Sequence, residues 1–331
     1  MVRSKPKYTY TLGCPHYFWF SEKLRPETAE SRVRSFKLSD VANSLLIISH
    51  SKRGQTKEAV EKLKSMLQLD QVPMNLAITR LVQALGNHGD VAGIQEVESL
   101  IKSLGTDMNL SSMVFVNNTA LAHITNGDVE SAVELFDGIY TSPNSSNASM
   151  SFVFRKVLES GNDKALDKLS AMAERLANHF ACYRPASDLF LQLLDLDKVD
   201  DAKFMLARCN ALAEQKEALL SFVAQKAQSP GQIGKIKNLM SLVPDFTEKE
   251  VLYAYLMKCH VLDKDLPSAK SLYEQMQKEG LHVDELSLKR LAGLYHEAGE
   301  TAPFSEPPES FKFYAERLRE KAAKHQAQAE E

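Results

Sequence analysis

The sequence has few of the residues that mark tight turns, disulfide frameworks and membrane spans. Its 331 residues include 14 glycines and 12 prolines, and this scarcity argues against an all-β protein with many tight turns. The four cysteines lie far apart and form no CxxC pair, which favours a reduced intracellular compartment. No apolar run approaches the roughly 20 residues that a membrane-spanning helix needs, so we predict no membrane span.

The sequence also lacks an excess of charge of one sign. It contains 40 Lys and Arg residues against 43 Asp and Glu residues, for a net charge of -3. A protein that binds nucleic acid through its overall field is basic, so any nucleic-acid site here must be local or shared with a partner. The length exceeds the roughly 250–300 residues of one ordinary core, which predicts two domains or a repeat array.

Motifs of catalysis and metal binding are missing as well. The sequence has no H-E-x-x-H, G-x-S-x-G or P-loop pattern. His179 and Cys182 have the spacing H-x-x-C, but no second pair lies nearby, so a packed helix end is favoured over a zinc site. We therefore predict a protein that is not an enzyme and that needs no metal or cofactor.

What the sequence does contain is a repeat of about 35 residues. Helix-breaking residues recur at that interval, and each lies between two segments whose apolar residues have helical spacing. The breakers are Gly54, Gly89, Gly127, Gly161, Lys198, Gly231, Asp265 and Gly299. One helix pair cannot bury its apolar face alone, so neighbouring pairs stack. We therefore predict an all-α fold, a right-handed α-solenoid of about eight helix-turn-helix units over residues 38–326.

Local signals support these units. In the seventh unit, Thr247 and Glu250 predict a capping box at the first helix, Pro267 suits the first turn of the second helix, and Gly280 ends it. A small residue early in several second helices allows close packing: Ala59, Ala132, Ala202 and Ala269. The last unit has a longer turn and a polar helix, typical of a terminal cap, before a polar tail at 327–331.

Residues 266–284, LPSAKSLYEQMQKEGLHVD, resemble the second half of a pentatricopeptide repeat (PPR), and residues 132–136, AVELF, repeat part of it. Further segments are similar, in the same order, to a leucine-rich mitochondrial branch of the PPR family: residues 38–48, 77–85, 113–122, 172–178 and 306–315. The resemblance runs from about residue 36 onward. It implies that the chain corresponds to the C-terminal portion of a much longer protein.

The resemblance implies single-stranded RNA binding along the first helices, with mitochondrial mRNA as the partner. It further implies roles in mRNA stability, polyadenylation and translation in the mitochondrial matrix, with an additional nuclear pool. A small RRM protein, the stem-loop-interacting RNA-binding protein, is the implied protein partner. The alternative is an α-solenoid scaffold that binds proteins without direct RNA contact, because solenoid faces commonly serve that purpose.

In the family's scheme, the fifth residue of each first helix contacts the base edge and the second packs against the base. Fifth positions lie ten residues before each turn: Ser44, Thr79, Asn117, Ser151, Ser187, Ser221, Ala254 and Lys289. Second positions are mostly aliphatic: Val41, Leu76, Val114, Ala148, Arg184, Ala218, Val251 and Leu286. We take the Ser, Thr and Asn residues, with Val41, Leu76 and Val114, as candidate RNA-binding residues. Ordinary helix packing is the alternative reading.

The last position of each repeat follows the family's pattern at Asp284 alone, so base-specific readout is less expected here than backbone contact or weak binding. The N-terminal residues 1–37 form a separate segment with aromatic residues among basic ones: Tyr8, Tyr10, Tyr17, Phe18, Trp19 and Phe20 with Arg3, Lys5, Lys7 and Lys23. Such a cluster can stack on unpaired bases. We favour packing of these residues on the first repeat or on a preceding repeat, of which the segment would be the remnant.

Overall fold

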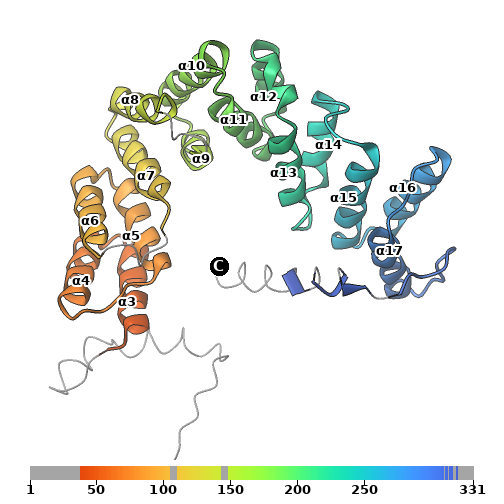
Figure 1. The fold of residues 1–331 in the computed structure, drawn as a ribbon, viewed down its shortest axis with the longest axis horizontal. Helices are drawn as coiled ribbons and strands as arrows, with labels where there is room; N and C mark the ends of the chain where they lie inside the picture. Colours follow the sequence, from red (N-terminus) through yellow and green to blue (C-terminus); the bar gives the residue numbers. More distant parts are fainter. Residues whose placement is uncertain are drawn as a thin grey trace, which may run out of the picture. The chain divides into compact units, whose positions relative to one another are not determined.

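The computed structural model describes residues 38–104, 110–142, 148–308, 310–311, 313–315 and 318–319 (Figure 1). These residues form helices and connecting turns, without a strand, so the predicted all-α class is confirmed. The N-terminal segment 1–37 and the tail 327–331 lie outside the described residues. None of the helices in the described ranges has the length and hydropathy needed to cross a membrane.

The helices alternate between two roles along the chain, as the repeat predicts. The first helices of the units are α3 (Asp40–Lys52), α5 (Asn75–Asn87), α7 (Ser112–Thr125), α9 (Ser151–Ser160), α11 (Arg184–Asp195), α13 (Lys216–Lys226), α15 (Lys249–Leu262) and α17 (Glu285–Glu297). The second helices are α4 (Thr56–Gln68), α6 (Val91–Ser103), α8 (Val129–Tyr140), α10 (Asp163–Phe180), α12 (Val199–Arg208), α14 (Ile233–Leu242) and α16 (Leu266–Lys278). A short 3-10 helix, η3 (Asn210–Glu214), follows α12 and was not predicted.

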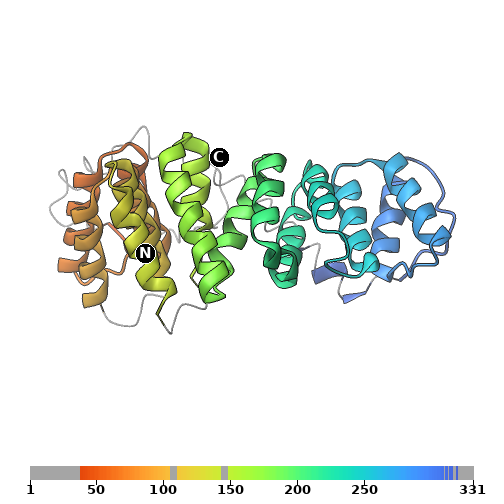
Figure 2. The same cartoon turned by 90° about the horizontal axis from the view of Figure 1, so that it is seen from above.

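Two compact units divide the chain, Met1–Thr125 and Asn126–Glu331. In the first unit, α5 packs against both α3 and α7, so the three first helices form one layer (Figure 1). The second helices α4 and α6 pack on that layer and on each other (Figure 2). Each helix therefore buries its apolar face against the next pair, as expected for stacked repeats.

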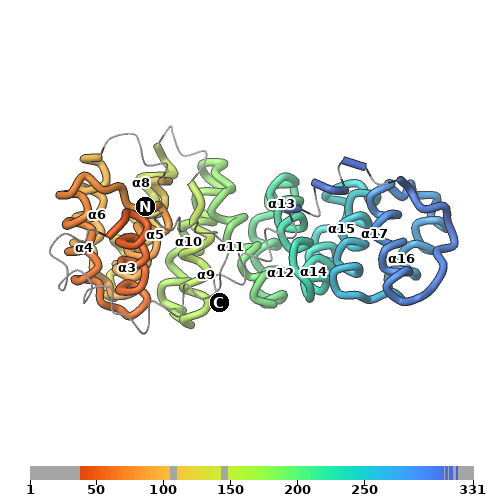
Figure 3. The backbone as a smooth tube through the Cα atoms, turned by 90° about the horizontal axis from the view of Figure 1, so that it is seen from below, coloured from red at the N-terminus to blue at the C-terminus, as the bar shows by residue number. Residues whose placement is uncertain are grey.

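The second unit has the same local order. Its first helices contact one another in sequence, α9 with α11, α11 with α13, α13 with α15, and α15 with α17 (Figure 3). The second helices α10, α12, α14 and α16 pack against first helices of this layer. The second helices thus cover one side of the first-helix layer, and a ligand could contact only the other side.

The turn inside each helix pair contains one residue in the left-handed backbone region. Six of these residues are the predicted glycines, and the fifth and seventh turns use Asp197 (φ 57°) and Lys264 (φ 56°). The left-handed residue therefore comes one position before Lys198 and Asp265, the breakers expected from the sequence. A Cβ disfavours this region, so these two turns carry a small backbone strain that glycine would relieve.

Small residues at the helix crossings confirm the predicted close packing. Ala59, Ala132, Ala202 and Ala269 are fully buried, each near the start of its second helix. In the first unit, Ala59 belongs to a core that also includes Ile47, Leu63, Ile78, Leu81 and Leu85. Phe136, Phe154 and Phe190 are the largest fully buried side chains of the second unit.

One predicted cap is wrong and two helix-end signals are confirmed. The N-cap of α15 is Glu248, without a side-chain bond, rather than Thr247. Glu250 does not close a capping box, and its carboxylate instead accepts the His282 N–H of the next linker over 3.2 Å. Pro267 does lie in the first turn of α16, and Gly280 has the left-handed φ of 70° expected of a residue that ends a helix.

Candidate functional site

Two of the predicted second-position residues are exposed on the first unit. Val41 on α3 is 56% exposed and Leu76 on α5 is 48% exposed, although both are aliphatic. Leu45, Val72 and Met74 nearby are exposed as well. We call these five residues the unit-1 apolar face. Val114, the third predicted residue, instead packs in part against the core of the first unit.

Backbone hydrogen bonds fix the linker of this face beside α3. The Val72 N–H donates to Asp40 Oδ2 over 3.3 Å, and the Met74 N–H donates to Ser44 Oγ over 3.0 Å. Asn43 and Gln71 also bond to each other through their side chains over 2.7 Å. The apolar side chains are therefore held in place by polar contacts behind them, which makes the face preformed.

The predicted fifth positions of the first unit differ in their exposure. Ser44 is 0% exposed, and its hydroxyl accepts the Met74 N–H, so it serves the linker. Thr79 is half-buried and donates to the Asn75 carbonyl over 2.9 Å. Asn117 on α7 is also half-buried. Thr79 and Asn117 are thus the fifth-position residues of this unit that are partly exposed, although the Oδ1 atom of Asn117 is itself buried.

The second unit shows a similar spread. Ser187 on α11 is buried, whereas Ser151 on α9 is half-buried and accepts a hydrogen bond from Ser149 Oγ over 3.2 Å. Ser221 on α13 is exposed. Its turn is longer than the others, because α13 ends at Lys226 and the left-handed Gly231 comes five residues later. The structure does not bring these three serines together at one point.

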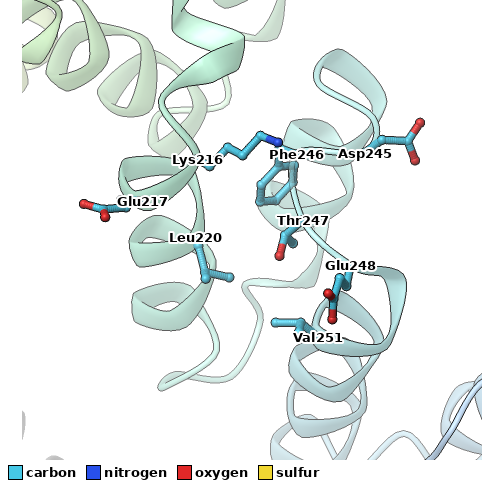
Figure 4. A pocket seen from close by; sticks show the side chains of 8 residues that line it. All are labelled: Lys216, Glu217, Leu220, Asp245, Phe246, Thr247, Glu248 and Val251. Carbon is cyan, nitrogen blue, oxygen red and sulfur yellow. The ribbon is translucent and has the colours of Figure 1, made fainter.

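A cavity of about 510 Å³ lies between the N-terminal ends of α13 and α15 (Figure 4). Leu220 of α13 and Val251 of α15 point into it, and Phe246 lies behind them. Lys216, Thr247 and Glu248 supply an ammonium, a hydroxyl and a carboxylate. The cavity is therefore a site with apolar walls and polar groups between two neighbouring first helices.

The charges around this cavity are of both signs. Its lining includes the carboxylates of Glu217, Asp245 and Glu248 and one lysine, Lys216. In Figure 4, Glu217 and Asp245 point away from the cavity, while Lys216 points toward Phe246. The repeat register predicts Val251 as a second position and Lys216 as a last position of a repeat, whereas Leu220, Thr247 and Glu248 occupy positions that the RNA scheme does not use.

Most cations on the first helices of the second unit are paired with carboxylates. Arg184 pairs with Asp188 over 3.2 Å, Lys249 with Glu279 over 3.3 Å and Lys289 with Glu306 over 2.5 Å. Such pairs lower the local positive potential that a polyanion would meet. The first-helix layer of this unit is accordingly close to neutral rather than strongly basic.

Asp195, the last residue of α11, pairs with three cations at once. Its side chain, 6% exposed, accepts from Arg155 of α9 (2.9 Å), Lys226 of α13 (2.5 Å) and Lys235 of α14 (2.8 Å). Burial alone would raise the pKa of Asp195, but the hydrogen bonds from Lys226 and Lys235 outweigh it and hold the pKa at about 2. Asp195 is therefore ionised at neutral pH and joins four helices.

The described ranges contain no group of three His, Cys, Asp or Glu side chains placed to hold a metal ion. Cys182, Cys209 and Cys259 are free thiols. Burial raises the pKa of Cys259 to about 11, so this thiol is protonated and unreactive at neutral pH. The N-terminal aromatic and basic cluster lies outside the described residues.

Comparison with known proteins identifies repeats in this chain and relatives of it. The PPR repeat model matches residues 44–70 and 251–281. Leucine-rich PPR motif-containing proteins, named as mitochondrial, are 52% identical in Xenopus tropicalis and 45% identical in Rattus norvegicus, each over 296 residues. These alignments cover 89% and 88% of this chain but 21% of each relative. The chain thus spans about a fifth of the length of these curated relatives.

Among solved structures, the chain is similar to the pentatricopeptide repeat protein PPR10 in complex with an 18-nt psaJ RNA element, at 13% identity and a TM-score of 0.31. That alignment covers 87% of this chain and 46% of the other. The family assignment depends instead on the matched repeats and the sequence relatives. With these matches and its paired helices, the chain belongs to the pentatricopeptide repeat family, as a relative of part of the mitochondrial leucine-rich PPR motif-containing proteins.

Proposed function

We propose that this chain binds single-stranded RNA along its first-helix layer. The observation that carries the proposal is an aliphatic helix position that is open to solvent at some of the repeats of each unit, although Val114 and Ala148 at the same position are packed or buried. Val41 and Leu76 are exposed on the unit-1 apolar face, and Val251 points into the cavity between α13 and α15 (Figure 4). Unpaired bases present flat apolar faces, which such side chains can cover.

The arrangement favours contact with base faces over contact with phosphates. Thr79, Ser151 and Ser221 are short polar residues of the first helices that are at least partly exposed, and Asn117 is partly exposed with its Oδ1 buried. Ser44 and Ser187 are buried, so we leave them out of the proposed RNA surface. Because many cations are paired, we infer modest affinity and weak base selectivity for this part of the protein.

We further infer, from the family relation, that the full protein acts on mitochondrial mRNA in the matrix. Stability, polyadenylation and translation of mRNA are the processes it would support, together with a small RRM protein as partner. We propose no catalytic step, because a stacked helix layer that covers bases needs none. A protein-binding scaffold is the second candidate, and the paired cations of the second unit favour it.

The test compares two exposed leucines of the first unit. Leu76 belongs to the unit-1 apolar face, and Leu69, 51% exposed, caps the C-terminal end of the second helix α4. Leu76→Ala should weaken binding to an oligouridine of about 12 nucleotides by about fivefold, the loss of about 1 kcal/mol of apolar contact. Binding is measured by fluorescence anisotropy at ~100 mM salt.

Leu69→Ala is the matched control, because it removes the same atoms at a similar exposure from a second helix. It should bind RNA as the unmodified chain does. Equal losses in both variants would show that the first-helix face has no special role. Absence of RNA binding by the unmodified chain, or equal binding to duplex DNA, would overturn the proposal and leave the scaffold as the function to test.

A further inference from the structure

The first helix of the last repeat, α17, carries a lysine, Lys289, on the first-helix layer that we propose binds RNA (the RNA layer). Lys289 lies ten residues before the left-handed Gly299, in the same register as Thr79 and Asn117 in the first unit. Its side chain is 13% exposed. Lys289 is thus a cation of the first-helix layer that solvent barely reaches.

The C-terminal segment is what covers it. Lys289 Nζ lies 2.5 Å from Glu306 Oε1 and 5.9 Å from the centre of the Phe313 ring. Both residues follow α17 in the chain, so the segment turns back over its own helix. The carboxylate of Glu306 and the ring of Phe313 are thus both neighbours of the Lys289 ammonium group.

Aromatic packing holds this segment in position. The Phe304 ring lies 5.2 Å from the ring of Tyr273 on α16 and 6.3 Å from that of Tyr295 on α17. Glu306 Oε2 also lies 3.6 Å from Nε2 of His296 on α17. The segment is therefore held at Phe304 by aromatic contacts and at Glu306 by its contacts with Lys289 and His296.

A carboxylate and a phosphate compete for the same lysine ammonium. Both are anions that accept charge-assisted hydrogen bonds at about 2.8 Å, so a lysine bound by one has fewer donors for the other. The hydrogen bond from Lys289 holds the pKa of Glu306 below its usual range, so the carboxylate is charged at neutral pH. The contact is exposed at its outer edge, where an RNA strand could replace it.

We propose that Lys289 is a phosphate-binding residue of the RNA layer and that the C-terminal segment occludes it through Glu306. The segment then acts as an intramolecular competitor that limits RNA binding at the last repeat. The inference rests on the proposed function, since it names the regulation of the same layer. The last repeat then has two states. In the closed state Glu306 pairs with Lys289, and in the open state this pair is broken and Lys289 can bind a phosphate.

The experiment removes the competing charge and keeps the shape of the side chain. Glu306→Gln should strengthen oligouridine binding about threefold and steepen the logarithmic salt dependence by about 0.7, as expected for one added phosphate contact on a single strand. The double variant Glu306→Gln with Lys289→Gln should lose this gain. A gain that persists without Lys289 would overturn the proposal, as would unchanged binding by Glu306→Gln.

Glu300→Gln is the matched control, because Glu300 forms the same kind of pair with Lys270 on the second helix α16. This variant removes an equal charge from the same end of the molecule but outside the first-helix layer. It should leave RNA affinity and salt dependence unchanged. A threefold gain in this control as well would reveal a general charge effect and contradict the specific role of Lys289.

Occlusion itself is tested without RNA. Acetylation by acetic anhydride, followed by mass spectrometry, should modify Lys289 several times faster in Glu306→Gln than in the unmodified chain, with Lys270 unchanged. Equal modification rates would show that the segment does not shield Lys289. Faster modification without RNA binding by any variant would confirm the occlusion but overturn the RNA role of Lys289 together with the proposed function.

Discussion

At the scale of single residues, Asp195 is distinctive because its one carboxylate pairs with three cations. Its partners Arg155, Lys226 and Lys235 come from three other helices, and Arg155 also pairs with Glu159 of its own helix. Removing one member of such a buried group leaves the others without compensation, and this usually costs more than the group contributed net. The residue therefore has a structural importance that its position at the end of α11 does not suggest.

Asp195→Asn should lower the free energy of unfolding by about 3 kcal/mol, because the lysines then face a neutral amide. Thermal and urea unfolding at neutral pH measure the change. Asp167→Asn, at an exposed aspartate on α10, is the control and should stay within about 0.5 kcal/mol. Equal stability of both variants would contradict the role of Asp195.

The same residue predicts a pH dependence. The pKa of Asp195 is about 2 in the folded chain and about 3.9 in an unfolded one, so the folded state favours the ionised form. Its contribution is fully present above about pH 4 and is lost as the pH falls toward 2. Comparing urea unfolding of the unmodified chain and Asp195→Asn between pH 5 and about pH 3 should show their stabilities converging as the pH falls.

At the candidate site, the sequence predicts which residues lie on the outer side of a first helix, but not which of them stay exposed. The repeat register identifies Val41 and Leu76, and the structure places both in the open. It also identifies Ser44, whose hydroxyl is used by the Met74 N–H of the next linker. A register fixes which side of the helix a residue faces, but the path of the following linker decides whether that side stays open.

At the scale of helices and turns, α5 and α7 cross closely at a glycine. A Cβ added to Gly86 would lie 3.0 Å from both the carbonyl oxygen and Oδ1 of Asn118. Gly86→Ala should therefore destabilise the chain by about 1–3 kcal/mol, measured by urea unfolding.

Gly138→Ala on α8 is the matched control for this crossing. Nothing lies within 4 Å of a Cβ built there, so alanine should be neutral or stabilise by up to about 1 kcal/mol through its higher helix propensity. The opposite order of the two variants would show that the crossing of α5 and α7 is not limited by Gly86.

The seventh turn offers a stabilising change. Lys264 has a φ of 56°, which glycine adopts without steric cost. Lys264→Gly should stabilise the chain by about 1 kcal/mol. Lys264→Ala removes the same side chain and its exposed pair with Glu297 but keeps the Cβ. Thermal unfolding should place the glycine variant above the alanine variant, and equal midpoints would contradict the argument.

Sequence reasoning performs well for elements, since glycines and apolar spacing locate all eight pair turns to within a residue. It fails for the cap of α15 because Thr247 lies one position before the N-cap that the backbone uses. The segment η3 was missed because its five residues contain neither breaker nor period. Short-range signals thus determine helix existence, while linker geometry determines helix ends.

At the scale of the whole molecule, net charge and pairing limit RNA binding. The chain has a net charge of -3, and carboxylates neutralise much of its first-helix charge. Few phosphates can then be contacted, so the logarithm of the RNA binding constant should fall with the logarithm of salt at a slope shallower than about -2. Anisotropy titrations from ~50 to ~200 mM salt give this slope. A slope near that of a strongly basic binder would contradict the base-face interpretation.

Because Asp195 pairs with residues of three other helices, it also affects how cooperatively the second unit unfolds. In a linear stack each repeat touches its immediate neighbours, so stability is a sum of nearest-neighbour interfaces and ends can fray independently. Asp195 links the fourth, fifth and sixth pairs through one carboxylate. Amide hydrogen exchange in α9, α11 and α13 should therefore report a single opening free energy, so that these three repeats behave as one cooperative block inside an otherwise modular chain.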